Sequence, residues 1–527
     1  MVREVSVENG SWLKLEREEL RQTLQLGAVF ALITVVVHIV INLRAQHVGY
    51  GLFRDEMYYI VCGRNLAWGY VDQPPIVALA ARFSELVFGW HSLWLFRLLP
   101  SLAGGLEVAG TGLLVREMGG GRMAQILAMI GVMAAPGILG IDSFLSMNCF
   151  EPLFWMGTAY SVLRAVRGDT PRWWAIAGIS AGLGLENKWN EFFFLFAMLA
   201  ALLLTPARRA LGRSFALCFA LIVLIALPNL LWEIPRGWPT LVWLHNAATQ
   251  GKNIVYGPGD FLLNQVLMLG PLSCLLWLGG LVWLLTNRAA QGLRWIGVMY
   301  VLYLLGMMAL HANDYYLAPV YPLLFAAGAV AWDEWLTAEW SRRVAAPVYT
   351  CIIVAFGLLG TLSVEPVLTP PEYARYITPI GLKPRDFNPM LRGLLPELPA
   401  DMTGWRDVAD KVAQTYWSLP LSDRSKAGIL VGNYGEAAAI TLYRPDLPVA
   451  ISGNQNYWYW GPRVYDGSVM VVFGESRELL EQRFASVREV ARTTNKWGHY
   501  FEAAPVYICR NAKQDLRESW PEWKEWF

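Results

Sequence analysis

Charged residues, cysteines and nucleotide-binding motifs are all scarce in this chain. Only 16% of its 527 residues are charged and the net charge is +1, so nucleic acid is not an expected partner. The six cysteines are scattered, which favours neither a disulfide framework nor a zinc site. No P-loop, GxGxxG or HExxH motif occurs, and no cofactor is predicted. None of these absences decides whether the protein depends on a divalent metal.

Apolar runs dominate what is present. Hydrophobic residues make up 55% of the chain and the mean hydropathy is +0.34, which predicts a polytopic α-helical membrane protein. Because about two dozen mostly polar residues precede the first apolar run, we expect that run to be a retained signal anchor. The patterns predict about eleven membrane-spanning helices and one interfacial helix near 74–89. The predicted spans lie near 24–42, 93–115, 123–141, 150–166, 172–187, 190–205, 213–232, 261–286, 294–310, 316–335 and 344–363.

The basic residues predict an orientation. If the N-terminus is cytoplasmic, alternation of the spans places every arginine-bearing loop inside, as the positive-inside rule requires. These loops carry Arg116 and Arg122; Arg164, Arg167 and Arg172; Arg208, Arg209 and Arg213; Arg288 and Arg294; and Arg342 and Arg343. The same alternation places 43–92, 142–149, 233–260, 311–315 and everything after 364 outside. We therefore expect a bacterial inner-membrane protein with its polar clusters on the extracytoplasmic face.

The chain changes character near residue 364, which divides it into a transmembrane domain (1–363) and a C-terminal domain (364–527). A proline-rich linker comes first, with Pro366, Pro370, Pro371, Pro379 and Pro384. Buried strands are then predicted at 427–435, 468–476 and 504–510, alternating with helices at 404–418 and 476–490. That alternation predicts a small extracytoplasmic α/β domain. Its VGNYGEA turn could be a strand–glycine–helix anion site, but a plain tight turn is the simpler interpretation.

The segment 53–75, FRDEMYYIVCGRNLAWGYVDQPP, lies in the first predicted external loop, 43–92. It places Asp55 and Glu56, the candidate catalytic carboxylates, side by side, followed by Tyr58, Tyr59 and Asp72 as candidate substrate contacts. Charge at a membrane interface is costly unless it faces water, protein or a ligand. The adjacent carboxylates could be a solvated pair. Because neighbours on a helix point apart, one could instead face a site while the other bonds to backbone or to a basic residue.

Four further polar clusters fall on the same predicted face. Glu151 precedes a proline and could either cap a span or serve the site. Lys188, in a tight turn, could snorkel or hold a phosphate as a point charge. Arg97 enters an apolar segment and needs an anionic partner, either protein or ligand. The segment HANDYYLAPVYP contains Tyr315 and Tyr316 as candidate substrate contacts, and its His311–Asp314 pair is too little to predict a metal site.

Taken together in order and spacing, these motifs resemble a known family. FRDEMYY, GYVDQPP, LWLFRLLP, EPLFW, GLENKWN and NDYYLAPVYP resemble the bacterial branch of the dolichyl-phosphate-mannose–protein mannosyltransferases, glycosyltransferase family 39 of the C-type superfamily. The resemblance covers about 20–335, and GNYGEAAAI and ISGNQNYWYWGPR resemble the extracytoplasmic domain of many bacterial members. It implies an inverting transferase with Asp55 as the catalytic aspartate and with Arg97 and Lys188 as phosphate contacts.

Two departures from the family pattern concern the acidic and basic loops. The usual Asp-x-Pro of the second acidic loop is replaced by Asn148 and the Glu151–Pro152 pair. The lysine that often precedes Asp-Tyr-Tyr is Asn313 here.

The sequence thus predicts a glycosyltransferase that moves a sugar from a polyprenyl-phosphate donor to a protein, lipid or glycan acceptor. No Asp-x-Asp triplet is present to hold a metal-bound nucleotide sugar, which favours a sugar carried on a lipid phosphate. The main alternative is a polytopic transporter or flippase. Transporters usually show an internal repeat and charges near the midplane, whereas this sequence indicates charges at one interface. A structural or assembly protein is a third interpretation, which leaves Asp55, Arg97 and Lys188 without a task.

Overall fold

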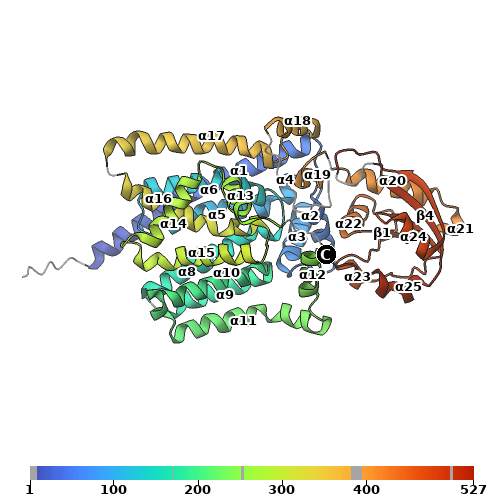
Figure 1. The fold of residues 1–527 in the computed structure, drawn as a ribbon, viewed down its shortest axis with the longest axis horizontal. Coiled ribbons are helices and arrows are strands. Elements are labelled where there is room, and N and C mark those ends of the chain that lie inside the picture. The colour runs from blue at the N-terminus through green and yellow to red at the C-terminus, as the bar shows by residue number, and fades with distance from the viewer. Residues whose placement is uncertain are drawn as a thin grey trace, which may run out of the picture.

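A computed structural model describes residues 9–168, 170–250, 255–336, 338–380, 394–498 and 503–526. An elongated bundle of helices occupies one part of the molecule, and a sheet-containing domain packs against one end of it (Figure 1). The first half of the bundle contains α1 (Asn9–His47), α2 (Arg54–Arg64), α3 (Ile76–Phe88), α4 (Leu93–Phe96), α5 (Leu98–Glu117), α6 (Arg122–Met133), α7 (Pro136–Asp142), α8 (Met147–Gly168), α9 (Pro171–Asn187) and α10 (Asn190–Leu204). The second half contains α11 (Arg213–Glu233), α12 (Pro239–Thr249), α13 (Pro258–Leu269), α14 (Cys274–Thr286), α15 (Arg294–Ala309), α16 (Tyr321–Trp335), α17 (Ala346–Val364) and α18 (Pro370–Ile380). Short helical turns η1 (Pro206–Ala210), η2 (Ile234–Arg236), η3 (Gln291–Leu293), η4 (Asp314–Val320) and η5 (Ser341–Ala345) complete it.

Each predicted span falls on helix, but several are not single straight helices. Within the described ranges, six helices are long and apolar enough to cross a membrane, or up to eight if each bent pair is one span. The predicted span 261–286 is broken into α13 and α14, bent by 116°, and 123–141 is broken into α6 and α7, bent by 68°. Gly270 lies at the first break with φ +90°, a conformation that favours glycine, and Pro136 begins α7 after the second. The predicted interfacial segment 74–89 is helix α3.

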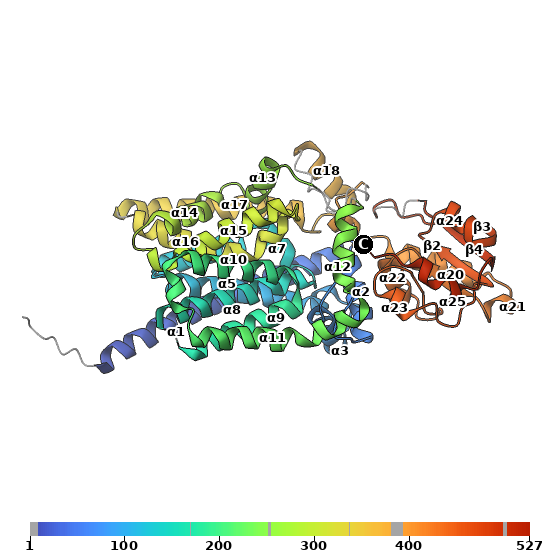
Figure 2. The ribbon, with the colours of Figure 1, turned by 60° about the horizontal axis from the view of Figure 1, so that its bottom comes forward.

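The two ends of the bundle carry different side chains. At one end Arg116, Arg164 and Arg167 all pair with Glu117, with N–O separations of 2.9–3.2 Å. These arginines come from two of the loops predicted to be internal. The sheet domain lies at the opposite end, in both views of the molecule (Figures 1 and 2).

Small residues allow a close crossing of α9 and α11. Gly178 and Gly182 of α9 face α11, where a Cβ on Gly178 would lie 2.6 Å from the Cys218 carbonyl oxygen. A Cβ on Gly182 would lie 2.8 Å from that of Ile225. These two glycines form a GxxxG pattern, which serves close helix packing here.

Two of the buried carboxyl groups of the bundle belong to α5 and α7. Glu107, halfway along α5, is 1% exposed, and Asp142, at the end of α7, is 3% exposed. The two carboxyl groups are close enough for the charge of Glu107 to act on Asp142. The expectation that charges gather at one interface was therefore incomplete, because the sequence did not reveal that Glu107 faces protein.

Residues 394–526, here called the tail domain, contain a four-stranded sheet of order β1-β2-β4-β3. Its strands are β1 (Gly428–Val431), β2 (Val469–Phe473), β3 (Phe484–Arg492) and β4 (Pro505–Ala512). β1 and β2 are parallel, whereas β2–β4 and β3–β4 are antiparallel. The helices are α19 (Glu397–Ala400), α20 (Trp405–Trp417), α21 (Leu421–Arg424), α22 (Tyr434–Tyr443), α23 (Tyr457–Trp460), α24 (Arg477–Arg483) and α25 (Leu516–Ser519), with a final turn η6 (Trp520–Trp523).

Three of the four strands coincide with the predicted ones, and α20 coincides with the predicted helix 404–418. The predicted helix 476–490 is wrong beyond residue 483, where β3 pairs along the edge of the sheet. Only Phe484 of β3 is buried, so the strand pattern in its sequence is weak. The segment is nevertheless a strand, because it pairs with β4. The predicted linker is helical at α18, and Pro384 lies outside the described residues.

Candidate functional site

Asp55 and Glu56 occupy the first turn of α2 and point in different directions. Successive helical residues are rotated by about 100°, so adjacent side chains cannot share one set of partners. Glu56 is 0% exposed and faces the helix bundle, whereas the Asp55 side chain is 28% exposed and faces the tail domain. The interpretation that one carboxylate faces a site while the other is bonded into the protein fits this arrangement.

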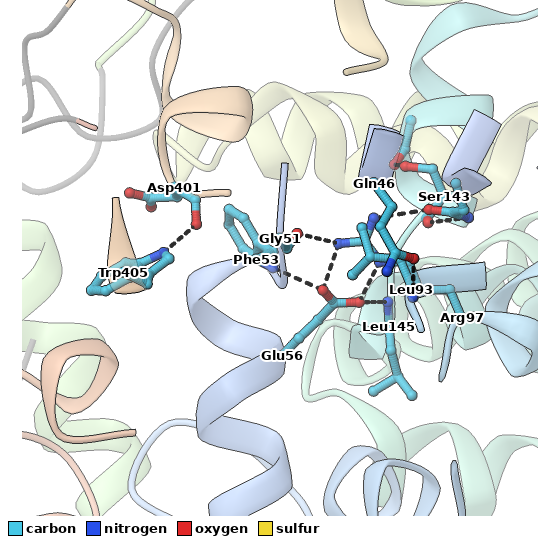
Figure 3. Close-up of polar contacts among 12 residues, drawn as sticks. Gln46, Gly51, Phe53, Glu56, Leu93, Arg97, Ser143, Leu145, Asp401 and Trp405 are labelled. Carbon is cyan, nitrogen blue, oxygen red and sulfur yellow. Dashed lines mark hydrogen bonds and ion pairs between the residues drawn. The ribbon is translucent and has the colours of Figure 1, made fainter. Parts of the chain in front are cut away.

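Glu56 is the centre of a buried ion pair with Arg97 (Figure 3). Arg97 Nε and Nη2 donate to the two carboxylate oxygens at 2.9 and 2.6 Å, and Arg97 Nη1 donates to Asn42 Oδ1 at 2.9 Å. The backbone N–H groups of Phe53 and Leu145 also donate to Glu56, each at 2.8 Å. A buried carboxylate needs this degree of compensation.

The pairing bears on two of the candidate residues. Arg97 is 1% exposed and its donors are directed at Glu56, Asn42 and the Gly51 carbonyl. This geometry does not favour Arg97 as a contact for a lipid phosphate. Nor does it favour Glu56 as a catalytic group, because its oxygens already accept from the guanidinium and two backbone amides. The arginine required an anionic partner, and the protein supplies one.

Asp55 has a different environment. Tyr434, from the tail domain, donates its hydroxyl hydrogen to Asp55 Oδ1 at 2.7 Å. Arg54 Nε lies 3.4 Å from the same oxygen, and Arg54 also pairs with Asp401 at 3.1 Å and with Glu397 at 3.6 Å. One Asp55 oxygen is thus engaged by neighbouring groups while the side chain remains partly exposed.

Three more predicted residues gather near Asp55. Tyr58 donates to Asp72 Oδ1 at 3.1 Å and packs against the Tyr434 ring at 4.7 Å between centroids. Burial raises the pKa of Tyr59 well above its usual range, and the charges of Asp55 and Asp72 raise it further. Tyr59 is therefore a neutral hydroxyl at physiological pH. We call Asp55, Tyr58, Tyr59, Asp72 and Tyr434 the Asp55 cluster.

Lys188 is the centre of a second group. It is the C-cap of α9, and its ammonium donates to Asn148 Oδ1 at 2.7 Å and to Glu151 at 2.9 Å. Asn190 donates to the other Glu151 oxygen at 2.7 Å. The ammonium also lies 4.4 Å from the Tyr316 ring centroid, a cation–π distance. We call Asn148, Glu151, Lys188, Asn190, Tyr315 and Tyr316 the Lys188 cluster.

Tyr315 connects the two clusters. Lys188 lies 5.4 Å from its ring centroid. Burial raises the pKa of Tyr315 well above its usual range, and the charges of Glu151 and Asp55 raise it further. The structure therefore brings together Asp55, Tyr58, Tyr59, Asp72, Glu151, Lys188, Tyr315 and Tyr316. Glu56 and Arg97 are not part of this group, because their ion pair is buried in the bundle, where it supports α2.

The structure shows what the residues at one of the departures from the family pattern contact. Asn148 and Glu151, which stand where the second acidic loop usually reads Asp-x-Pro, both accept from Lys188. Glu151 lies one turn inside α8 (Met147–Gly168), so the capping interpretation is less well supported than its role as the counter-ion of Lys188.

Sequence reasoning missed Tyr434 and Asn190. The VGNYGEA turn does not leave its amides free, because Asn433 Oδ1 accepts from the N–H groups of Gly435 and Glu436. Glu436 accepts in return from Asn433 N, which completes a capping box. The Asn-x-x-Glu spacing was a readable signal for this cap. Nothing in the sequence indicated that the tyrosine inside it would reach Asp55.

Metal-ligand geometry is not found around these clusters. In the described part of the chain, no three His, Cys, Asp or Glu side chains are arranged to hold a metal ion. Asp314 of the His311–Asp314 pair instead accepts from Asn264 at 2.6 Å. A hollow of about 390 Å³ lies at the arginine-bearing end of the bundle, lined by Met118, Gly119, Gly120, Trp283, Ala289, Val330, Asp333 and Glu334. It is remote from both clusters.

Comparison with known proteins confirms the resemblance indicated by the motifs. Residues 72–232 match the family described as dolichyl-phosphate-mannose-protein mannosyltransferase. A curated relative, lipid A galacturonosyltransferase RgtD from Rhizobium johnstonii, is 28% identical over 194 residues. That match spans 34% of this chain and 38% of the relative.

The fold is shared with a protein of known structure, ArnT. ArnT from Cupriavidus metallidurans, solved bound to undecaprenyl phosphate, aligns with a TM-score of 0.58 over 91% of this chain and 97% of that one, at 15% identity. The same protein in its apo state gives 0.58 at 14% identity. At these identities the likeness concerns the fold alone.

Proposed function

We propose that this chain is an inverting glycosyltransferase that moves a sugar from a polyprenyl-phosphate donor to an acceptor at the extracytoplasmic membrane face. The observation that carries the proposal is that a partly exposed carboxylate, Asp55, and a cation, Lys188, both lie near Tyr315 at one end of the bundle. A base and a phosphate-binding cation are the two groups that such a transfer requires.

Asp55 is proposed as the general base. It accepts the proton of the acceptor hydroxyl or amine while that atom forms a bond to the anomeric carbon of the sugar. The bond from the anomeric carbon to the phosphate oxygen breaks on the opposite face, which inverts the configuration. The electron pair leaves with the polyprenyl phosphate, so no covalent enzyme intermediate and no additional reactant are needed.

Lys188 is proposed as the contact for the departing phosphate. An ammonium has three N–H donors, and Asn148 and Glu151 accept two of them. A phosphate oxygen can accept the third and interact with the positive charge as it develops negative charge. Because Arg97 is bound to Glu56, the proposal does not include it in the phosphate site.

The remaining members of the clusters are proposed to contact the sugar and the acceptor. Tyr58, Tyr59, Tyr315 and Tyr316 provide hydroxyl and aromatic surface, and Asp72 and Glu151 provide hydrogen-bond acceptors. The names of the relatives suggest galacturonic acid or mannose as the sugar and lipid A as one acceptor.

We also propose that the chain resides in a bacterial inner membrane with the tail domain outside, and that residue 364 separates the two domains.

The test uses the full chain in lipid nanodiscs. Undecaprenyl-phosphate galacturonic acid and undecaprenyl-phosphate mannose serve as donors, with lipid A as acceptor, and release of undecaprenyl phosphate and sugar-modified lipid A are measured. Asp55→Asn keeps the size of the side chain but cannot accept the proton, so turnover should fall by about 10²–10⁴-fold while donor binding persists.

The control is Asp515→Asn, the same chemical change at a partly exposed tail-domain residue that pairs with Arg517. It should leave turnover unchanged. Near-parental turnover of Asp55→Asn would refute the role of Asp55. Movement of the donor across vesicle membranes without any sugar transfer would instead favour a transporter or flippase.

A further inference from the structure

Tyr434 stands 379 residues from Asp55 in the sequence but donates a hydrogen bond to its carboxylate at 2.7 Å. It is the first residue of α22, in the tail domain. Burial raises the pKa of Tyr434 well above its usual range, so the side chain is a neutral donor. A hydrogen bond from a neutral hydroxyl to a carboxylate is stronger than one between neutral groups.

The tail domain holds Tyr434 in a defined orientation. The capping box of Asn433 and Glu436 fixes the start of α22, and the Tyr434 backbone N–H donates to Asn454 Oδ1 at 3.3 Å. On the other side, the Tyr434 ring lies 4.7 Å from the Tyr58 ring and 5.5 Å from the Arg54 guanidinium carbon. These contacts hold the ring with its hydroxyl directed at Asp55.

A second contact from the tail domain reaches Asp72 through Tyr58. The backbone N–H of Asn456 donates to the Tyr58 hydroxyl at 3.3 Å, and Tyr58 donates onward to Asp72 at 3.1 Å. Both carboxylates of the Asp55 cluster are thus bonded, directly or through one side chain, to the tail domain.

The tail domain is anchored to the bundle at sites separate from Asp55. Gly51 N donates to the Met402 carbonyl at 2.8 Å, and Arg54 pairs with Asp401. On another side, Asn246 of α12 donates to the Trp526 carbonyl at 2.9 Å. Figures 1 and 2 both show α22 beside α2 at this junction. Several independent contacts therefore fix the distance between Tyr434 and Asp55.

We infer that Tyr434 is a positioning residue for Asp55, so that the tail domain supplies part of the transferase site. The hydrogen bond holds one carboxylate oxygen and leaves the other to receive the acceptor proton, and it stabilises the ionised base. This inference rests on the proposed function. The charged and titratable groups that face Asp55 are Arg54, Tyr59, Tyr315 and Tyr434, with Asp72 next to Tyr58 and Tyr434.

Tyr434→Phe removes the hydroxyl and keeps the ring against Tyr58 and Arg54. With the full chain in nanodiscs and the donors named above, kcat should fall about tenfold while the donor KM stays constant, because one charge-assisted hydrogen bond is lost. The acid limb of the pH–rate profile should move to higher pH, since the ionised carboxylate has lost a donor.

A second measurement does not depend on turnover. Carbodiimide labels protonated carboxyl groups, and labelling of Asp55 is followed against pH by peptide mass spectrometry. The midpoint should move up by about one pH unit in Tyr434→Phe, because one unit corresponds to the energy of a single such hydrogen bond. Tyr443→Phe is the matched control: it removes a hydroxyl at the other end of α22, where Tyr443 packs against Trp90. Its midpoint and kcat should equal those of the parent.

The outcomes separate the two proposals. An unchanged labelling midpoint in Tyr434→Phe overturns the role of Tyr434, whatever the turnover. If that midpoint moves but Asp55→Asn keeps parental turnover, the contact exists and the proposed catalytic role of Asp55 fails. Equal shifts in Tyr434→Phe and Tyr443→Phe would show a general loosening of the junction and would also overturn the inference.

Discussion

At the scale of single residues, the adjacent carboxylates Asp55 and Glu56 have different surroundings. Glu56 is fully buried and compensated by Arg97 and two backbone amides, whereas Asp55 remains partly exposed at the junction with the tail domain. A base needs a carboxylate oxygen that the acceptor can reach, whereas both Glu56 oxygens accept from Arg97 in the interior of the protein. The surroundings, not the residue types, therefore distinguish the proposed base from the structural acid.

The Glu56–Arg97 pair leads to a prediction about stability. Arg97→Met should lower the free energy of unfolding by about 3–5 kcal/mol, because it leaves a buried charge without its partner. Glu56→Gln should destabilise for the same reason. The double variant Glu56→Leu/Arg97→Met should recover part of the loss, since neither charge remains. Thermal unfolding in detergent measures all three. Parental stability of Arg97→Met with weakened binding of undecaprenyl phosphate would return Arg97 to the phosphate site.

Lys188 leads to a prediction about binding. Lys188→Ala should weaken binding of undecaprenyl phosphate by about tenfold or more, because a charge-assisted contact is lost. The measurement is the rise in unfolding temperature that undecaprenyl phosphate causes, referred to each variant's own midpoint. Arg164→Ala, which removes a partner of Glu117 at the opposite end, is the control and should respond as the parent does. Equal responses of the two variants would exclude Lys188 from the phosphate site.

At the scale of elements, breaks in the helices place the functional side chains. Arg97 lies at the break between α4 and α5, and Lys188 lies between α9 and α10. Side chains at helix ends face the end of the bundle, where polar groups can meet without crossing its apolar middle. Close packing against α11 supports α9, the helix that ends at Lys188.

Gly178 tests this dependence on packing. A Cβ there would lie 2.6 Å from the Cys218 carbonyl oxygen of α11, so Gly178→Ala should destabilise the protein by about 1–3 kcal/mol. Gly168→Ala, at the end of α8, meets no atom within 4 Å and should be neutral. Thermal unfolding of the two variants provides the comparison. If Gly178→Ala is as stable as Gly168→Ala, the helices do not cross as closely as described.

At the scale of the whole molecule, the tail domain and the arginine-bearing loops lie at opposite ends of the bundle (Figure 2). The proposed site therefore lies at the junction of two parts of the chain that are far apart in sequence. If the tail domain is outside, the donor lipid must present its phosphate on that same side.

This arrangement predicts the topology. Truncated fusions to alkaline phosphatase and to green fluorescent protein at Arg209 and at Asp401 should report opposite sides of the membrane. The positive-inside rule places Arg209 in the cytoplasm and Asp401 outside. A cytoplasmic signal at Asp401, or the same side for both positions, would contradict the orientation and with it the proposed face of catalysis.

The sequence alone determined the class of the protein and most candidate residues, because those signals are local. Apolar runs and strand-forming segments encode helix and sheet within a few residues of themselves, and the basic loops predict an orientation. Local periodicity failed where neighbours decide the outcome, as at β3, which forms by pairing with β4. Only the tertiary structure decided that Arg97 belongs to Glu56 and that Tyr434 reaches Asp55 from 379 residues away. Such contacts depend on how helices cross and domains dock, which is set by the packing of the whole chain and not by any single segment.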